Sequence, residues 1–165
     1  MKLIKSGGDD IGIVLKEMSI GDSDSFYRLY FGDKSSVQDQ TTGEQQMNPK
    51  QFAEHIMSLC NELFTIRTVE NNHIIIGDCA LHHWNKEEKK IEIGGSLLPD
   101  YWGKGIMSAA FVLLITLAKE KYQVNIMVAK TEITNLKALK FAEKLGFKKI
   151  SMEGDNIVFE KEIMI

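Results

Sequence analysis

Residues 92–110, EIGGSLLPDYWGKGIMSAA, hold the side chains and glycines in this sequence that are best suited to chemistry. An apolar run ends at Pro99, and Gly103 and Gly105 then precede a second apolar run that is long enough for a helix. Glycine allows backbone amides to approach a ligand closely, and a helix N-terminus presents unpaired N–H groups with a partial positive charge. A strand, a glycine turn and a helix in this order favour the binding of a phosphate group.

Two common phosphate-binding motifs do not fit this turn. A Walker A loop requires GxxxxGK followed by Ser or Thr, whereas Gly103-Lys104 is followed by Gly105 and lacks the earlier glycine. A dinucleotide fingerprint requires GxGxxG, but Ser108 stands where the third glycine belongs. A third candidate is a turn that holds the pyrophosphate of coenzyme A, and the residues around the turn bear on it.

The run LLPDYWGKGIM resembles the signature of the GNAT superfamily of N-acetyltransferases. It is most similar to the branch that acetylates the N-termini of ribosomal proteins and to its small-molecule relatives. The family's turn, Gln/Arg-x-x-Gly-x-Gly/Ala, falls on residues 102–107, where Gly105 matches strictly while Trp102 and Met107 depart from the pattern. A second similarity follows in the run NLKA at 135–138 and in EKLGF at 143–147. The resemblance extends over about residues 10–163.

This resemblance implies a site for acetyl-coenzyme A and no metal ion. The turn's backbone amides are expected to hold the pyrophosphate, backbone groups of the preceding strand to contact the thioester and pantetheine, and an asparagine to lie near the pantetheine arm. That asparagine is also typical of a helix N-cap, and the lysine of the turn is also typical of a solvated helix start. The implied cofactor-binding residues are Leu97, Leu98, Trp102, Gly103, Lys104, Gly105, Ile106, Met107, Ser108 and Asn135.

Glu92 is the candidate catalytic residue, because relatives place a general-base glutamate on the strand that enters the turn. An ammonium group has no lone pair for attack until it loses a proton. The alternative for Glu92 is an ordinary solvent-facing carboxylate. His82 and His83 are adjacent on a predicted strand, so we expect them on opposite faces, where they cannot easily share a metal ion. Whether Glu92 or one of these histidines is the base stays open.

Other residues bear on the reaction. Gly94 and Gly95 predict either a bulge, which in this family makes room for the cofactor, or a plain kink. Relatives carry a hydroxyl group, which can protonate the departing thiolate, where this chain has Ala138 and Ala142. The sequence therefore predicts a reaction without a general acid, or a substitute for it, of which Tyr101 is the nearest in sequence.

Length, charge and cysteine content restrict the classes of function. A chain of 165 residues predicts one domain over residues 1–165, and a net charge of -3 without basic runs argues against nucleic acid as a main partner. Cys60 and Cys79 are too few for a disulfide framework or a zinc cluster and predict reduced thiols in the cytoplasm. The N-terminus lacks a signal-peptide core, and the apolar run at 109–115 is too short for a membrane span.

The apolar patterns, taken with the resemblance, predict an α/β (α+β) GNAT fold with a mixed, mostly antiparallel sheet of about seven strands and four helices. A tight hairpin turn is expected at Asn71-Asn72, and a loop near the acceptor site is expected over residues 31–48. Strands are predicted at 11–18, 63–69, 73–84, 91–98, 124–128, 147–151 and 157–163, and helices around 26–30 and over 49–60, 104–119 and 135–145.

The sequence therefore predicts an acetyl-coenzyme A-dependent N-acetyltransferase in which a primary amine attacks the thioester directly. Neither cysteine lies in a motif suited to a covalent nucleophile. The alternative is a catalytically silent coenzyme A-binding domain, and a third hypothesis is a protein-binding adaptor with a decayed cofactor site. The acceptor amine, on a peptide or on a small molecule, stays open, as does the assembly, for which a homodimer is one option.

Overall fold

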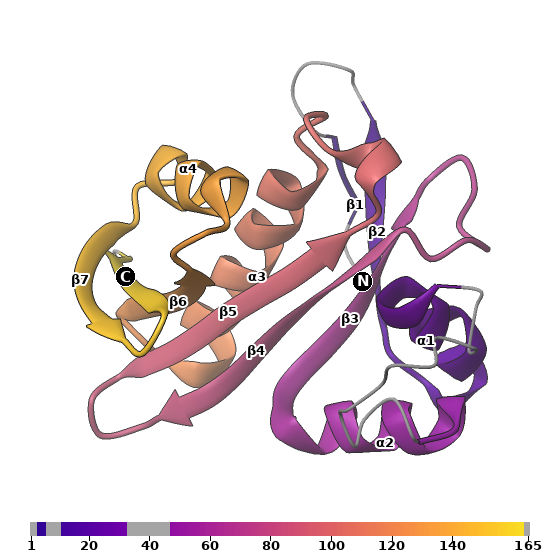
Figure 1. Ribbon diagram of the computed structural model, residues 1–165, viewed down its shortest axis with the longest axis horizontal. Coiled ribbons are helices and arrows are strands. Elements are labelled where there is room, and N and C mark those ends of the chain that lie inside the picture. The colour runs from indigo at the N-terminus through magenta and orange to yellow at the C-terminus, as the bar shows by residue number, and fades with distance from the viewer. Residues whose placement is uncertain (1–2, 6–10, 33–46, 164–165) are drawn as a thin grey trace. The chain divides into compact units, whose positions relative to one another are not determined.

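Figure 1 shows the computed structural model, which describes residues 3–5, 11–32 and 47–163. The chain forms two compact units. Unit 1 comprises Met1–Ala80 and Gly95–Ala110, and unit 2 comprises Leu81–Gly94 and Phe111–Ile165. Three elements contribute residues to both units along the chain, namely β4 (Gly77–Asn85), β5 (Lys90–Leu97) and α3 (Ile106–Tyr122). A single domain over residues 1–165 stays a prediction.

The strands of unit 1 follow the order β1-β2-β3-β4-β5. The strands β1 (Leu3–Lys5), β2 (Gly12–Glu17) and β3 (Cys60–Thr68) pair in antiparallel fashion, with Leu15 opposite Ile66. Ile13 and Leu15 are fully buried, and their neighbours along β2 are less so, which is the two-residue period of a strand with one face in the core. This confirms the first predicted strand.

The helices of unit 1 are η1 (Ile20–Asp22), α1 (Ser23–Phe31), α2 (Pro49–Leu59) and η3 (Pro99–Tyr101). The start of α2 follows from a capping box, because the Asn48 side chain accepts from Gln51 N at 2.8 Å and the Gln51 side chain accepts from Asn48 N at 3.0 Å. Figure 1 shows α1 and α2 side by side, and Phe26 and Phe52 stack between them with ring centroids 5.5 Å apart. The loop predicted at 31–48 lies almost wholly outside the described residues.

The connection from β3 to β4 differs from the predicted tight turn. β3 ends at Thr68 and β4 begins at Gly77, so residues 69–76 form a longer connection, and neither Asn71 nor Asn72 has a positive φ. The cause is the buried Arg67 guanidinium, whose donors need acceptors. It donates to Asn72 O at 3.1 Å and to the Asp22 carboxylate at 3.0 Å. The prediction of a left-handed hairpin turn at Asn71-Asn72 is wrong.

The strands of unit 2 follow the order β4-β5-β6-β8-β7. β5 pairs in parallel with β6 (Ile126–Glu132), which is reached through α3, whereas β6 pairs antiparallel with β8 (Asn156–Glu162) and β8 with β7 (Lys148–Glu153). A parallel pair needs such a crossover, while β7 and β8 form a hairpin in which Gly154 adopts a φ of 61°. The strands predicted at 147–151 and 157–163 are confirmed.

The last helix, α4 (Leu136–Lys144), confirms the helix predicted at 135–145. Gly146 has a φ of 90° and donates to Glu143 O, and Phe147 N donates to Ala142 O, both at 3.0 Å. These two bonds are those of a Schellman motif, which needs a left-handed residue after the helix. Phe147, the residue after the glycine, is buried, at 3% exposure.

The predicted fold is confirmed, with its mixed, mostly antiparallel strands and its four helices α1 to α4. The short β1, at Leu3–Lys5, is an additional strand before the first predicted one. Among the described residues, none of the helices combines the length and the hydropathy that crossing a membrane requires.

The aromatic cluster between α1 and α2 predicts a large effect of truncating Phe52. Phe52 is 2% exposed, whereas Leu59 on the same helix is 57% exposed. Because a buried ring leaves a cavity, Phe52→Ala should lower the free energy of unfolding by about 3–5 kcal/mol. Leu59→Ala, the control, should change it by less than about 0.5 kcal/mol. Urea unfolding of both variants measures these values, and equal losses would contradict the packing.

Candidate functional site

The glycine turn of unit 1 lies directly before α3 (Ile106–Tyr122). Gly103 and Gly105 adopt φ values of 75° and 77°, in the left-handed region that favours glycine. A Cβ on Gly103 would meet nothing within 4 Å, so this position requires glycine for its conformation and not for space. The prediction of a strand, a glycine turn and a helix is confirmed.

The helix after the turn begins at Ile106, two residues later than expected. Ala109 N donates to Gly105 O at 3.1 Å, which closes the first helical turn. The first amides of a helix have no intrahelical acceptor, and here they belong to Ile106, Met107 and Ser108. These amides can hold an anion at the N-terminus of α3.

The strand end before the turn is tied to the turn itself. The exposed Trp102 donates from Nε1 to Leu97 O at 2.8 Å. Leu98 N donates to Ile76 O at 2.8 Å, and Leu98 O accepts from Tyr101 N at 2.9 Å. Most of the backbone groups of Leu97 and Leu98 thus already have partners in the chain, and their contact with a cofactor stays a prediction.

A buried carboxylate holds the same strand end, and the sequence analysis missed it. Asp78, in β4, is 3% exposed. Its Oδ1 accepts from Ser96 N at 3.0 Å and from Ser96 Oγ at 2.6 Å, and its Oδ2 accepts from Tyr30 OH at 2.6 Å. Burial raises the pKa of Asp78. The signal in the sequence is an aspartate within the apolar run from Ile74 to Leu81.

Two glycines allow β4 and β5 to approach closely in unit 1. A Cβ on Gly95 would lie 2.6 Å from Asp78 O, and a Cβ on Gly77 would collide with Ser96 O. Gly95 therefore marks a close backbone approach, which is one of the reasons for glycine in a strand. The bulge at Gly94 and Gly95 stays a prediction.

Glu92, in unit 2, lies at the centre of a charged cluster. Its side chain is only 12% exposed. Oε2 lies 2.8 Å from His82 Nε2, and Oε1 lies 3.0 Å from His83 Nδ1 and 3.6 Å from Lys130 Nζ. The alternative of an ordinary solvent-facing carboxylate therefore does not fit Glu92.

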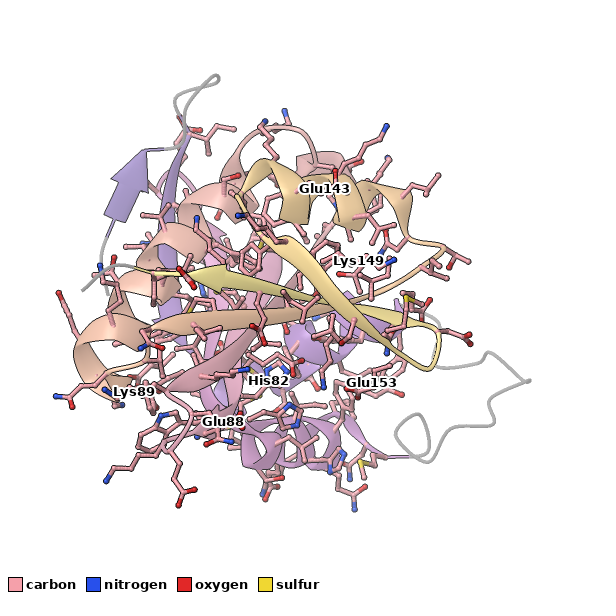
Figure 2. The ribbon with its side chains drawn as sticks, turned by 90° about the vertical axis from the view of Figure 1, so that its left-hand side faces the viewer. His82, Glu88, Lys89, Glu143, Lys149 and Glu153 are labelled. Carbon is pink, nitrogen blue, oxygen red and sulfur yellow. The ribbon has the colours of Figure 1, made fainter. Side chains whose placement is uncertain are left out.

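The two histidines do not lie on opposite faces, so that expectation is wrong. His83 has a φ of 55°, and this left-handed backbone breaks the alternation of side chains along β4. Both rings reach the same carboxylate, with their centroids 4.8 Å apart. Figure 2 shows the His82 side chain on β4, with Glu88 and Lys89 in the turn that follows the strand. Among the residues that the structure describes, a group that could ligate a metal ion is formed by the side chains of His82, His83 and Glu92.

The charges around Glu92 determine its ionisation. Burial opposes the charged form, but hydrogen bonds from His82 and His83 and the charge of Lys130 outweigh it and lower the pKa of Glu92 to about 2. Lys130 also lies 3.3 Å from Glu153, at the end of β7. Glu92 is therefore ionised at neutral pH and by itself a weak proton acceptor.

Asn135, Ala142 and the two cysteines were also named in the sequence analysis. The Asn135 side chain accepts from Ala138 N at 3.2 Å, which confirms the helix N-cap and leaves the contact with pantetheine a prediction. Ala142, where relatives carry a hydroxyl, is 6% exposed in unit 2. Cys60 and Cys79 are free, and burial raises the pKa of the Cys60 thiol to about 11 and that of Cys79 well above its usual range.

A model of the acetyltransferase (GNAT) domain family matches residues 13–148. Among curated proteins, the chain is similar to an uncharacterized N-acetyltransferase p20 of Bacillus licheniformis, at 32% identity over 81 residues, which cover 49% of this chain and 46% of that protein. It is also similar to a putative ribosomal N-acetyltransferase, YdaF, of Bacillus subtilis, at 33% identity over 73 residues, which cover 44% and 40% of the two chains. The matched part spans less than half the length of these relatives.

Among solved structures, the chain resembles RimL, a ribosomal L7/L12 alpha-N-protein acetyltransferase in complex with coenzyme A. The TM-score is 0.73 with 98% of both chains covered, at 15% sequence identity. At this identity the likeness concerns the fold.

The buried Asp78 predicts a pH-dependent effect of Asp78→Asn. Because burial raises the folded-state pKa of Asp78, its contribution to stability is fully present below the unfolded pKa of about 3.9 and is lost as the pH rises through the folded pKa. Asn does not ionise, so the stability of Asp78→Asn relative to the wild type should increase with pH from about 4 upward.

Urea unfolding at several pH values measures this difference. Tyr30 and Cys60, which face Asp78, have raised pKa values and stay neutral below about pH 8. Asp155→Asn, in the exposed turn between β7 and β8, is the control for the loss of a surface carboxylate. A difference for Asp78→Asn that is constant or shrinks with pH would contradict the buried-carboxylate argument.

Proposed function

Because this chain belongs to the acetyltransferase (GNAT) domain family, we propose that it transfers an acetyl group from acetyl-coenzyme A to a primary amine. The observation that carries the proposal is the glycine turn, in which Gly103 and Gly105 have left-handed backbones directly before α3. Together with the first amides of α3, the turn offers an N–H cradle with a partial positive charge. Lys104 adds a cationic side chain to the same turn.

The cofactor lies, in this proposal, with its pyrophosphate on the turn at residues 102–107. Ile106, Met107 and Ser108 would donate their backbone N–H groups to the phosphate oxygens. RimL, whose fold this chain resembles, was solved with coenzyme A, which supports the assignment of the ligand. Acetyl-coenzyme A supplies the activated acetyl group, and the chain supplies binding, orientation and proton handling.

The reaction is a direct attack of the amine on the thioester. The nitrogen lone pair forms a bond to the carbonyl carbon, the carbon–sulfur bond breaks, the nitrogen gives up one proton to become the amide, and coenzyme A leaves as a thiolate that takes up a proton. No covalent enzyme intermediate is needed, and the raised pKa values of Cys60 and Cys79 disfavour either as a nucleophile.

Glu92 and His82 are proposed to remove the ammonium proton. Glu92 belongs to β5, the strand that leads to the glycine turn through Leu97. Because the carboxylate is a weak acceptor, its role is to hold the His82 ring at 2.8 Å and to stabilise the charge that the ring gains. His82 or a water molecule that it holds takes the proton.

The acceptor is a primary amine on a peptide or on a small molecule. Two of the similar proteins are described as acting on ribosomal proteins, which supports a peptide N-terminus as the first acceptor to test. The net charge of -3 also suits a cationic acceptor. The free thiols of Cys60 and Cys79 suit a reducing cytoplasm.

The glycine turn predicts a loss of coenzyme A affinity in Gly105→Ala. A side chain there is strained at a φ of 77° and lies where a phosphate would approach the backbone, so the dissociation constant should rise by at least about tenfold. Gly154→Ala is a matched control, because Gly154 also has a positive φ, of 61°, but lies in the β7–β8 turn. Calorimetry with coenzyme A measures both, and an unchanged affinity in a folded Gly105→Ala protein would refute the assigned turn.

The Glu92 cluster predicts a loss of turnover in Glu92→Gln. The amide keeps the size of the side chain but cannot stabilise a proton on His82, so kcat should fall by about 10² or more while coenzyme A affinity holds. Thiol release, together with mass spectrometry of an amine and peptide panel, measures the reaction. A fall of less than about threefold would remove Glu92 from the mechanism. A wild-type protein that binds coenzyme A but acetylates no amine would instead be the silent binding domain.

A further inference from the structure

Three side chains of unit 2 bring metal-ligand atoms together at one point. His82, His83 and Glu92 each offer a ligand atom, and these atoms all lie within 4.8 Å of one another. We propose that they form a binding site for a single divalent transition-metal ion, for which Zn²⁺ is the best chemical match. His82 and Glu92 are also the pair proposed to take up the ammonium proton, so the ion and that proton compete for the same side chains, and metal binding is tested without substrate.

The spacing of the ligand atoms is close to what such an ion needs. Zinc binds imidazole nitrogen at about 2.0–2.1 Å and carboxylate oxygen at about 2.0–2.2 Å, so two ligands on a tetrahedral ion lie about 3.3–3.5 Å apart. The Glu92 oxygens lie 2.8 Å from His82 Nε2 and 3.0 Å from His83 Nδ1. These two separations have to open by about half an ångström, and the widest separation in the group, which is at most 4.8 Å, has to close by up to about 1.5 Å to admit the ion.

The backbone of His83 is what makes this convergence possible. In a regular strand, consecutive side chains point to opposite faces, so two adjacent histidines could not meet one carboxylate. The φ of 55° at His83 removes this obstacle. A left-handed conformation is strained for a non-glycine residue, and strain of this kind concentrates at functional sites.

The donor set selects the class of ion. Two imidazoles and one carboxylate bind Zn²⁺ in proteins and leave a fourth position for water, whereas Ca²⁺ and Mg²⁺ prefer sites made of oxygen. The Glu92 and His82 side chains are only 12% and 23% exposed, so the atoms packed around them restrict their movement. The His83 side chain is 69% exposed. Solvent thus reaches the site from the His83 side.

Lys130 opposes the ion and provides a way to test the site. Its Nζ lies 3.6 Å from Glu92 Oε1, where its charge repels a cation. Lys130 also lies 3.3 Å from the carboxylate of Glu153, whose side chain is 65% exposed, so the ammonium group has another partner when it leaves Glu92. Removing the Lys130 charge should therefore strengthen metal binding.

The test is calorimetric titration of ZnCl₂ into the full chain, without an affinity tag and without coenzyme A or amine. His83→Asn is the main variant, because Asn tolerates a left-handed backbone but removes the imidazole. His73→Asn, at an exposed position in the connection between β3 and β4, is the matched control. Lys130→Met tests the repulsion, and a thermal melt without metal checks that each variant is folded.

We expect one ion per chain, a dissociation constant at least tenfold weaker in His83→Asn, less than a twofold change in His73→Asn, and tighter binding in Lys130→Met. If His83→Asn does not fold, His82→Gln carries the same expectation at a residue with ordinary strand geometry. The site is overturned if the wild type binds no Zn²⁺, or if the folded histidine variant binds it as tightly as the wild type. Because no coenzyme A or amine is present, neither result bears on the proposed acetyl transfer, which is tested separately.

Discussion

The structure of unit 1 depends on the hydrogen bonds that the buried Asp78 carboxylate accepts. A carboxylate removed from water is costly unless donors replace the water, and Ser96 and Tyr30 supply three of them from β5 and α1. Among the described residues, no buried side-chain nitrogen or oxygen lacks a hydrogen-bond partner. Asp78 thereby holds both α1, through Tyr30, and the end of β5, through Ser96. The glycine turn comes soon after this end of β5 in the chain.

Unit 2 has a carboxylate of its own in the opposite electrostatic situation. Asp78 is faced by neutral donors, so burial dominates and its pKa rises, whereas Glu92 is faced by two imidazoles and an ammonium group, and its pKa falls. Asp78 therefore resists ionisation and acts as a structural tie, while Glu92 stays charged and attracts cationic partners. A proton on His82 and a metal ion are both partners of that kind.

Features set by neighbouring residues were predictable from the sequence. The N-caps at Asn48 and Asn135, the Schellman glycine at Gly146 and the left-handed glycines of the turn all follow from chemistry within a few residues of the chain. The order of the strands and helices along the chain followed from the apolar patterns and matched the order of the family that the sequence resembles.

Features set by distant partners were not predictable. The connection after β3 is set by Arg67, which reaches both Asn72 and Asp22, and no local pattern indicates that pairing. The backbone at His83 and the network of Asp78 with Tyr30 likewise depend on residues that only the fold brings together. The sequence indicated Glu92, but not the contacts with His82, His83 and Lys130 that lower the pKa of its carboxyl group.

The hairpin at the end of the chain has a consequence for solubility. β7 is the last strand in the order of unit 2, and its residues are all exposed, including Ile150 and Met152. A strand in that position can recruit a strand from another molecule and so start aggregation. β7 begins with Lys148 and Lys149 and ends with Glu153, and Figure 2 labels two of these side chains. Charges at both ends of the strand make the addition of a further copy unfavourable and help to keep the chain dispersed.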